Sequence, residues 1–542
     1  MVVACAGRPP LSAPTQSELA VAESLYADLR DVRDHIDVTV ASGRTRITDA
    51  TQTAAWIQNH NTLRRSVAAR LAAIDSATLR GDDRRALGVM RRTVERDIDS
   101  LVPPMAAAVT SAPASPNCAY DPKGMLGLPQ GLDSLRARVY ACYGGAQSHV
   151  VVGADTLDRL TILGTLGRTA DPARRRQLFL ALEPVWRSVN GDNGPGSPYR
   201  LLGVEAHREQ KGPLPSLIQV SASGVSPDSL EPWLIAMLET WRRANPDSLI
   251  EPWDWYYRMG QANWALSGRI SRDRLLQLNS MVYRSLGADV QKLQIQYDVK
   301  PRQGKTPVAY TTFGARPRFI NGSWRPGKPW VFATYRTGGL DNLSELLHET
   351  GHAVHIAAIR TRPAFTDWPD SDPFTEALAD FLALEVTEPA WQQHWLGDSV
   401  PLAEGLRARY SGIVMDVAWA LLEMRMQRDP ASDPNHLWTA LTRDYLRIRP
   451  HPELSWWAMR GQLVHAPGYM MNYAAGAMLI AAIRVRTREL HGRFTIGDAT
   501  WYGWIAPRLF RFGLERPSRE VIEEFLGGPV SPAAILADMA RK

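Results

Sequence analysis

The feature that most constrains the fold is how little of the sequence has the pattern of a β-strand. Runs rich in β-branched and aromatic residues, bounded by glycine and proline, are confined to 308–313 and 330–335. Before and after this region, apolar residues recur mostly at helical spacing. The sequence therefore predicts a mainly α fold with one small sheet.

The first hundred residues have the pattern of three consecutive amphipathic helices. They run from Ser17 to Val102, with breaks at Ser42-Gly43 and at Gly81-Asp82-Asp83. A long connection rich in proline, alanine and glycine follows at 105–132. Further helices are expected across 153–190 and 228–300.

Composition excludes two classes of protein. The longest apolar run, Tyr473 to Ile483, is far shorter than the roughly 18 residues that a membrane-spanning helix needs. The net charge of +6 is spread thinly, without a run of five basic residues. We therefore expect neither a transmembrane helix nor a nucleic-acid partner.

The three cysteines are informative by position. Cys5 follows Val-Val-Ala, which resembles the end of a bacterial lipoprotein signal, so Cys5 is a candidate for lipidation and membrane anchoring. The alternative is an arbitrary apolar N-terminus. Cys118 and Cys142 are either a disulfide in an oxidising compartment or two buried thiols. We expect a periplasmic or cell-surface location.

A candidate metal site follows the second strand pattern. His348 and His352 lie four residues apart within a helical pattern, with Asp341 as the expected N-cap. This spacing places two imidazoles on one helix face, where both can reach one metal ion. Glu349 can then contact a water bound to that ion. The motif predicts a catalytic zinc, Zn²⁺.

A catalytic zinc needs a third protein ligand. Glu376 and Asp380 lie one turn apart on a second, otherwise apolar helix pattern. Two carboxylates on a mostly buried helix are costly unless a metal and its histidine offset them. We therefore expect Glu376 to be the third ligand and Asp380 to orient a ligating histidine; the alternative is an exposed acidic face.

These motifs together resemble the angiotensin-converting-enzyme family of zinc peptidyl-dipeptidases, within the gluzincin clan. The resemblance rests on the segments His348-Glu349-Thr350-Gly351-His352 and Phe374 to Val386, and covers the chain from about residue 300. The segment from Gly351 to His355 also resembles the thimet-oligopeptidase family. Either resemblance implies a two-lobed helical fold around a deep cleft, with a small antiparallel sheet beside the zinc helix. We divide the chain into a tether (1–15), a helical lid (16–110) and a catalytic body (111–542) with the zinc site within 300–480.

The resemblance extends to residues expected to contact substrate. In the segment from Val464 to Tyr473, His465 and Tyr473 match the family's pair that stabilises the tetrahedral intermediate, with Tyr469 as an alternative donor and substrate contact. Asn321 and Ser323 lie in a segment that resembles the substrate-binding strand. His355 is expected beside the site, without ligating the metal.

Three departures weaken the case for dipeptide release. Leu463 stands where the family has the lysine that holds the substrate carboxylate, and Ile320 and Asn472 replace a family histidine and arginine. Arg460 could supply the missing cation, although a surface position is the simpler expectation.

The leading hypothesis is a zinc metallopeptidase that hydrolyses short peptides, with release of C-terminal dipeptides as the family-like specificity. The alternatives are a thimet-type oligopeptidase that cuts internally and a non-catalytic zinc-containing binding protein. The sequence leaves the oligomeric state open.

Overall fold

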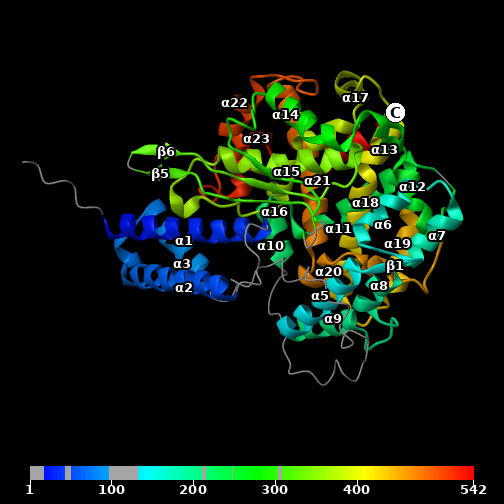
Figure 1. Ribbon diagram of the computed structural model, residues 1–542, viewed down its shortest axis with the longest axis horizontal. Coiled ribbons are helices and arrows are strands. Elements are labelled where there is room, and N and C mark those ends of the chain that lie inside the picture. Colours follow the sequence, from blue (N-terminus) through cyan, green and yellow to red (C-terminus); the bar gives the residue numbers. More distant parts are fainter. Residues whose placement is uncertain are drawn as a thin grey trace, which may run out of the picture.

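The computed structural model describes residues 17–42, 50–96, 132–209, 215–246, 248–302, 305, 308–320 and 322–542. Helices dominate this part of the chain, so the predicted mainly α class is confirmed (Figure 1). Within the same ranges, no helix combines the length and the apolar character needed to cross a membrane.

The three predicted N-terminal helices are present, but the predicted break at Gly81-Asp82-Asp83 forms the first turn of the third helix, and the chain is interrupted before it. They are α1 (Glu18–Ala41), α2 (Ala50–Ala73) and α3 (Gly81–Arg96). The Ser17 hydroxyl accepts the N–H of Ala20, as a helix N-cap does. The three helices bury a small core, which includes Leu29, Leu71 and Met90 and is completed by Phe365 from the catalytic body, and they lie at one end of the molecule (Figure 1).

Ion pairs with little solvent exposure join these three N-terminal helices to the rest of the protein. Arg316 Nε lies 2.8 Å from Asp34 Oδ2, and both side chains are almost fully buried. Arg362 Nη2 lies 2.7 Å from Glu23 Oε2. The predicted boundary at residue 110 and the predicted tether fall outside the described residues, so the domain division stays a prediction.

The middle of the chain forms a group of shorter helices. These are α5 (Leu132–Ser148), α6 (Arg159–Leu166), α7 (Pro172–Leu180), α8 (Glu183–Asn190), α9 (Pro198–Glu209), α10 (Pro215–Ala222), α11 (Pro227–Ala244), α12 (Trp255–Met259), α13 (Gln261–Leu266) and α14 (Leu275–Ser285). A two-stranded hairpin, β1 (Val150–Val152) with β2 (Asp155–Leu157), precedes α6 and was not predicted.

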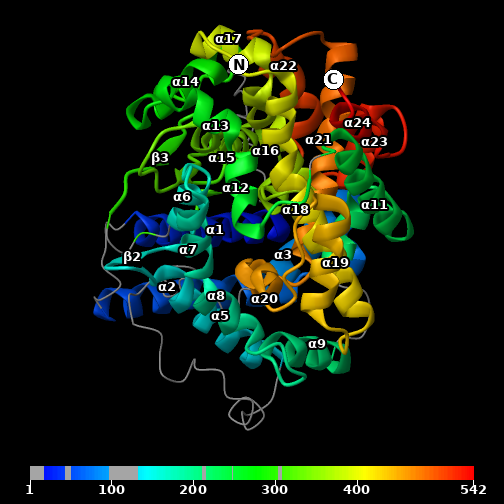
Figure 2. The same cartoon turned by 90° about the vertical axis from the view of Figure 1, so that its right-hand side faces the viewer.

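The C-terminal half carries the longest helices of the main core. They are α15 (Leu340–Ala358), α16 (Asp372–Ala383), α17 (Pro389–Leu396), α18 (Leu402–Arg428), α19 (Pro434–Leu446), α20 (Gln462–His465), α21 (Tyr469–Leu490), α22 (Trp501–Ile505), α23 (Ser518–Leu526) and α24 (Ala533–Met539). One continuous hydrophobic core joins them to the helices from α5 onward. Helix α21 packs on both α16 and α18, and α19 packs on α18, as Figure 2 shows.

The strands near the zinc-motif helix α15 differ in pairing from the prediction. The sheet beside α15 has the order β3-β7-β4, with β3 (Gln296–Asp298) parallel and β4 (Tyr310–Thr312) antiparallel to β7 (Trp330–Phe332). A separate hairpin is formed by β5 (Arg318–Ile320) and β6 (Ser323–Arg325). The small sheet is thus mixed rather than antiparallel, because a parallel partner comes from residues outside the predicted strand region.

Candidate metal centre

Helix α15 begins two residues earlier than an N-cap at Asp341 would place it, and a residue from another helix accepts a hydrogen bond from its first turn. The N-cap is Gly339, with a φ of 108° that only glycine adopts readily. The Asn263 side chain accepts the N–H of Leu340 at 2.6 Å. Asp341 therefore lies inside the first turn, and the prediction that it caps α15 is wrong.

The structure brings the three predicted metal ligands together. His348 and His352 lie on one face of α15, and Glu376 faces them from α16. Glu376 Oε2 lies 3.4 Å from His348 Nε2 and 3.7 Å from His352 Nε2. One ligand atom from each side chain lies within 4.8 Å of the other two. Both imidazoles direct the same nitrogen at one carboxylate oxygen, as ligands of a shared ion would.

Asp380 lies where the sequence predicted it. Its Oδ1 is 2.7 Å from His348 Nδ1, which leaves Nε2 of the same ring for a metal. Burial alone would lower the pKa of His348, but Asp380 and Glu376 outweigh burial and raise it. Burial would raise the pKa of Glu376, yet the two histidines lower it. The side chains therefore stabilise one another's charge in the absence of a metal.

This donor set fits zinc. Two imidazole nitrogens and one carboxylate oxygen form a known catalytic zinc set, with the fourth position open. His352 Nδ1 is buried and has no hydrogen-bond partner among the described residues, so Nε2 is the nitrogen of that ring that faces another donor. The orienting carboxylate of Asp380 completes the arrangement that usually surrounds such ligands.

Two glycines allow the ligand-bearing helices to approach closely. A Cβ atom on Gly351 would lie 2.4 Å from the carbonyl oxygen of Ala379, so α15 and α16 touch through their backbones. A Cβ on Gly476 of α21 would lie 3.1 Å from the carbonyl oxygen of Pro373. Close packing of α21 on α16 brings the tyrosines of α21 to the ligand helix.

Glu349 is held by a residue that the sequence did not single out. Thr311, in the middle of β4, has its hydroxyl 2.7 Å from Glu349 Oε2 and 2.8 Å from the Glu349 carbonyl oxygen. Glu349 is only 7% exposed. The strand pattern around Thr311 was predicted, but a threonine in a strand carries no signal for this contact.

The two tyrosines of α21 occupy different positions. The Tyr469 hydroxyl donates to Glu376 Oε1 at 3.3 Å, on the oxygen that does not face the histidines. Tyr473 packs edge-on against Tyr469, with ring centroids 5.1 Å apart. Burial, with Glu376 adding to it, raises the pKa of both phenols. Both are therefore protonated donors at neutral pH, and Tyr469 is already committed to Glu376.

His465 packs against helix α5. It is exposed at the end of α20, and its ring stacks on Tyr140 of α5 with centroids 4.9 Å apart. Burial of part of the ring, with Arg136 nearby, lowers its pKa. In the described part of the chain, no contact links His465 to Tyr473 or to the ligand cluster, so its role beside Tyr473 stays a prediction.

The segment around Ser323, which was expected to bind substrate, packs on helix α1. Ser323 is exposed in the β5–β6 hairpin, which lies over α1 (Figure 1). Arg318 and Arg325 pair there with Asp31 of α1 at 3.1 and 2.6 Å. Asn321 lies outside the described residues. Strand β4 contacts Glu349 through Thr311, so β4 lies beside the metal centre.

Arg460 is held in place by other side chains. Its guanidinium pairs with Asp416 of α18 and lies over the rings of Trp419 at 4.9 Å and Tyr473 at 6.0 Å. Arg460 is therefore close to a predicted catalytic tyrosine, although it was expected at the surface. Leu463 is buried, at 2% exposure.

His355 is part of an aromatic cluster rather than of the ligand set. It is fully buried, and its ring lies 5.7 Å from Trp368 and 5.6 Å from Phe510. Burial lowers its pKa to about 3, so the ring is neutral. Trp368 also packs edge-on against His352 at 5.5 Å, which fixes the orientation of that ligand.

Two solved structures are similar to the chain over almost its whole length. One, described as the structure of CHT, has 13% sequence identity and a TM-score of 0.57. The other, an M32 carboxypeptidase from Deinococcus radiodurans R1, has 15% identity and a TM-score of 0.56. Each alignment covers 96% of this chain and 98% of the other. At this identity the likeness shows a shared mainly α fold.

No protein-family model matches the chain, and no curated protein matches it either.

Proposed function

We propose that the protein is a zinc-dependent metallopeptidase that hydrolyses short peptides. The observation that carries the proposal is the convergence of His348, His352 and Glu376, with Glu349 beside them. The fold shared with an M32 carboxypeptidase supports a peptidase. The motifs around Glu376 and Tyr473 support the finer kinship with the angiotensin-converting-enzyme family.

The chain's own residues can divide the work of hydrolysis. When bound, zinc supplies a Lewis acid that polarises the scissile carbonyl and makes a water more acidic. Glu349 accepts the proton of the attacking water and later gives it to the leaving amine. Because Thr311 holds one oxygen of this carboxylate, the other is left for proton transfer.

Tyr473 is the proposed donor to the developing oxyanion. Its phenol is protonated at neutral pH because burial raises its pKa. The Tyr469 hydroxyl already donates to Glu376, so we assign the hydrogen bond to the oxyanion to Tyr473. Such a donor typically contributes about 100- to 1,000-fold in rate.

The proposed peptide site lies along β4. This strand is at the edge of the sheet, with order β3-β7-β4, and its middle residue contacts Glu349. An extended peptide can add to such an edge through main-chain hydrogen bonds. The scissile bond of a peptide bound in this way would lie near Glu349.

Recognition of the free C-terminal carboxylate of a substrate has weaker support than binding of the peptide backbone along β4. Leu463 is apolar and buried where the resembling family has a lysine. Arg460, the nearby cation, is already paired with Asp416. We therefore propose that binding depends mainly on the peptide backbone, with dipeptide release and internal cutting as outcomes that product analysis separates.

The experiment that tests the function is digestion of a mixed peptide library, followed by mass spectrometry. The zinc-loaded protein should cleave peptides, and chelation should abolish cleavage. Glu349→Gln should lower kcat/KM by at least about 100-fold at equal zinc content. Glu520→Gln, an exposed Glu-to-Gln change on α23, is the matched control. Zinc binding without any cleavage would leave the alternative of a zinc-containing binding protein.

We also propose that the protein works outside the cytoplasm, anchored through Cys5 if that residue is lipidated. Cys142 is disulfide-bonded, and disulfides persist mainly in oxidising compartments. Its predicted partner Cys118, like Cys5, lies outside the described residues.

A further inference from the structure

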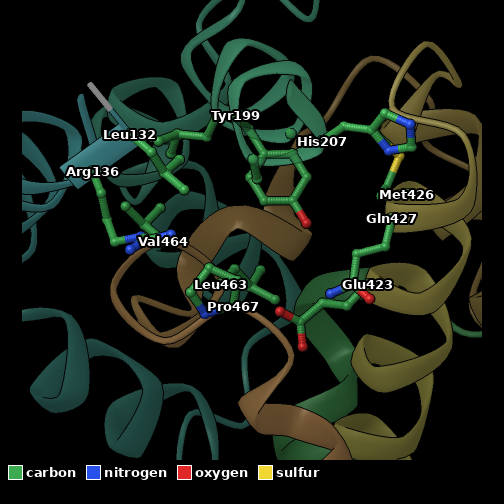
Figure 3. A pocket seen from close by; sticks show the side chains of 13 residues that line it. Leu132, Arg136, Tyr199, His207, Glu423, Met426, Gln427, Leu463, Val464 and Pro467 are labelled. Carbon is green, nitrogen blue, oxygen red and sulfur yellow. The ribbon is translucent and has the colours of Figure 1, made fainter. Parts of the chain in front are cut away.

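A cavity separate from the metal ligands lies between α5, α9, α18 and α20 (Figure 3). Its volume is about 340 Å³. Cavities of roughly 300–1,000 Å³ typically hold a small molecule. Most of its wall is apolar, with Leu202, Met426, Leu463 and Val464 among the lining residues. The wall includes neither the metal ligands nor Glu349.

One carboxyl group is placed in this apolar wall. Glu423, on α18, is only 2% exposed. Its Oε1 accepts the backbone N–H of Gly468, just before α21. Its Oε2 has no hydrogen-bond partner among the described residues. A buried carboxyl oxygen without a partner is costly, and Glu423 is one of the residues that line the cavity, so a donor bound there could relieve this cost.

A second polar group points into the same space. Figure 3 shows the Tyr199 hydroxyl directed into the cavity from α9, on the side where Glu423 lies. The ring of Tyr199 packs on Trp457 with centroids 4.7 Å apart, which fixes its direction. A phenol both donates and accepts, so it can accept a hydrogen bond from a ligand that also donates to Glu423.

Among the described residues, only burial and backbone N–H groups shift the pKa of the Glu423 carboxyl, and no cation does. From α5, Arg136 lines the cavity but pairs with Asp133 at 3.1 Å. From α9, His207 is exposed, and from α21 only backbone N–H groups reach the carboxyl. Burial raises the pKa of Glu423 to about 8, against the lowering by these N–H groups. The carboxyl is therefore mostly neutral at pH 7 until a cation pairs with it.

We propose that this cavity is a second ligand site, which binds an apolar primary amine as its ammonium ion. The ammonium donates to Glu423 Oε2 and to the Tyr199 oxygen, and the carbon body packs on Leu202 and Leu463. A carboxylate ligand would face Glu423 with like charge, and a neutral alcohol would lack the charge-assisted bond. A second charge on the ligand would meet the apolar wall.

Isothermal titration of the full-length protein with phenethylamine at pH 7 tests the proposal. We expect saturable binding with a Kd below about 1 mM. Glu423→Gln keeps an oxygen for the Gly468 N–H but cannot ionise, so it should weaken binding at least tenfold, or about 1.4 kcal/mol. Glu404→Gln, on the same helix, should leave binding unchanged. 2-Phenylethanol should bind wild-type protein at least tenfold more weakly than phenethylamine.

Two further measurements test the proposal even if the Glu423→Gln variant fails to fold. Ala206→Leu fills part of the cavity from α9 while Glu423 itself is unchanged, and it should abolish binding while the melting temperature stays the same. Titration in two buffers of different ionisation enthalpy should show release of most of one proton per bound amine at pH 7. The proposal is overturned by absence of saturable binding up to about 10 mM, by unchanged affinity in folded Glu423→Gln or Ala206→Leu, or by binding without proton release. None of these readouts depends on peptidase activity.

Discussion

Replacing Gly351 with alanine should damage the metal centre even though alanine favours helices. Gly351 lies between the two histidines of the zinc motif, against the backbone of α16. The added Cβ would lie 2.4 Å from the Ala379 carbonyl oxygen and 2.8 Å from its Cα. Ordinary contact begins at 3.4 Å, so α15 and α16 must separate locally by about 1 Å.

The magnitude follows from two opposing effects. Overpacking of this kind costs about 1–3 kcal/mol, whereas alanine in place of a helical glycine contributes about 0.5–1 kcal/mol of stability. We expect a net loss of up to about 2.5 kcal/mol in the free energy of unfolding. The same separation moves both histidines away from Glu376, so zinc affinity should fall by about 10- to 100-fold.

Urea unfolding and zinc competition with a chelator measure these two quantities. Gly412→Ala is the matched control, because a Cβ there has no neighbour within 4 Å and the position is exposed on helix α18. This control should gain about 0.5–1 kcal/mol and keep its zinc affinity. A Gly351→Ala protein that is stabilised like the control, with unchanged zinc affinity, would refute the close-packing argument.

Three other predictions concern catalysis, specificity and acid stability. Tyr473→Phe should lower kcat much more than it raises KM, since an oxyanion donor acts mainly in the transition state; steady-state kinetics would show an unchanged kcat if the donor is another residue. Amidation of a substrate's C-terminus should change kcat/KM by less than about tenfold, and a loss of a hundredfold or more would reveal a carboxylate pocket. Burial alone would raise the pKa of Glu388, but Arg409 and Arg541 outweigh burial and lower this pKa to about 2. The ionised carboxylate therefore stabilises the fold at pH values above its ordinary pKa, and this stabilisation is lost as the pH falls toward 2. Between pH 5 and 3, unfolding measurements should show a smaller loss of stability for Glu388→Gln than for wild-type protein, and equal losses would contradict this assignment.

The candidate metal ligands could be predicted from the sequence because their spacing is a matter of local geometry. His348 and His352 share a helix face by spacing alone, and Glu376 with Asp380 lie one turn apart on an apolar helix. Helix existence in α1 to α3 followed from periodicity in the same way. Local patterns of this kind predict which side chains share a face, and the structure then brings those faces together.

Contacts between distant elements were not predictable from local patterns. Asn263 caps α15 from a helix more than seventy residues earlier, and Thr311 holds Glu349 across the strand–helix contact. Strand β3 pairs in parallel with β7 although its short sequence, Gln296–Asp298, has no clear strand pattern. The orientation of His465 toward Tyr140 depends on α5, which the sequence did not connect with the site. In each case the deciding partner lies far away along the chain.

The most direct test of the account is anomalous diffraction at the zinc edge from crystals of the zinc-loaded protein. We predict one strong peak per chain, with His348 Nε2, His352 Nε2 and a carboxylate oxygen of Glu376 at about 2.0–2.2 Å from it. Crystals of Glu376→Ala should show a weaker peak or none. A peak at other residues, or the absence of a peak in zinc-loaded wild-type protein, would contradict the central claim.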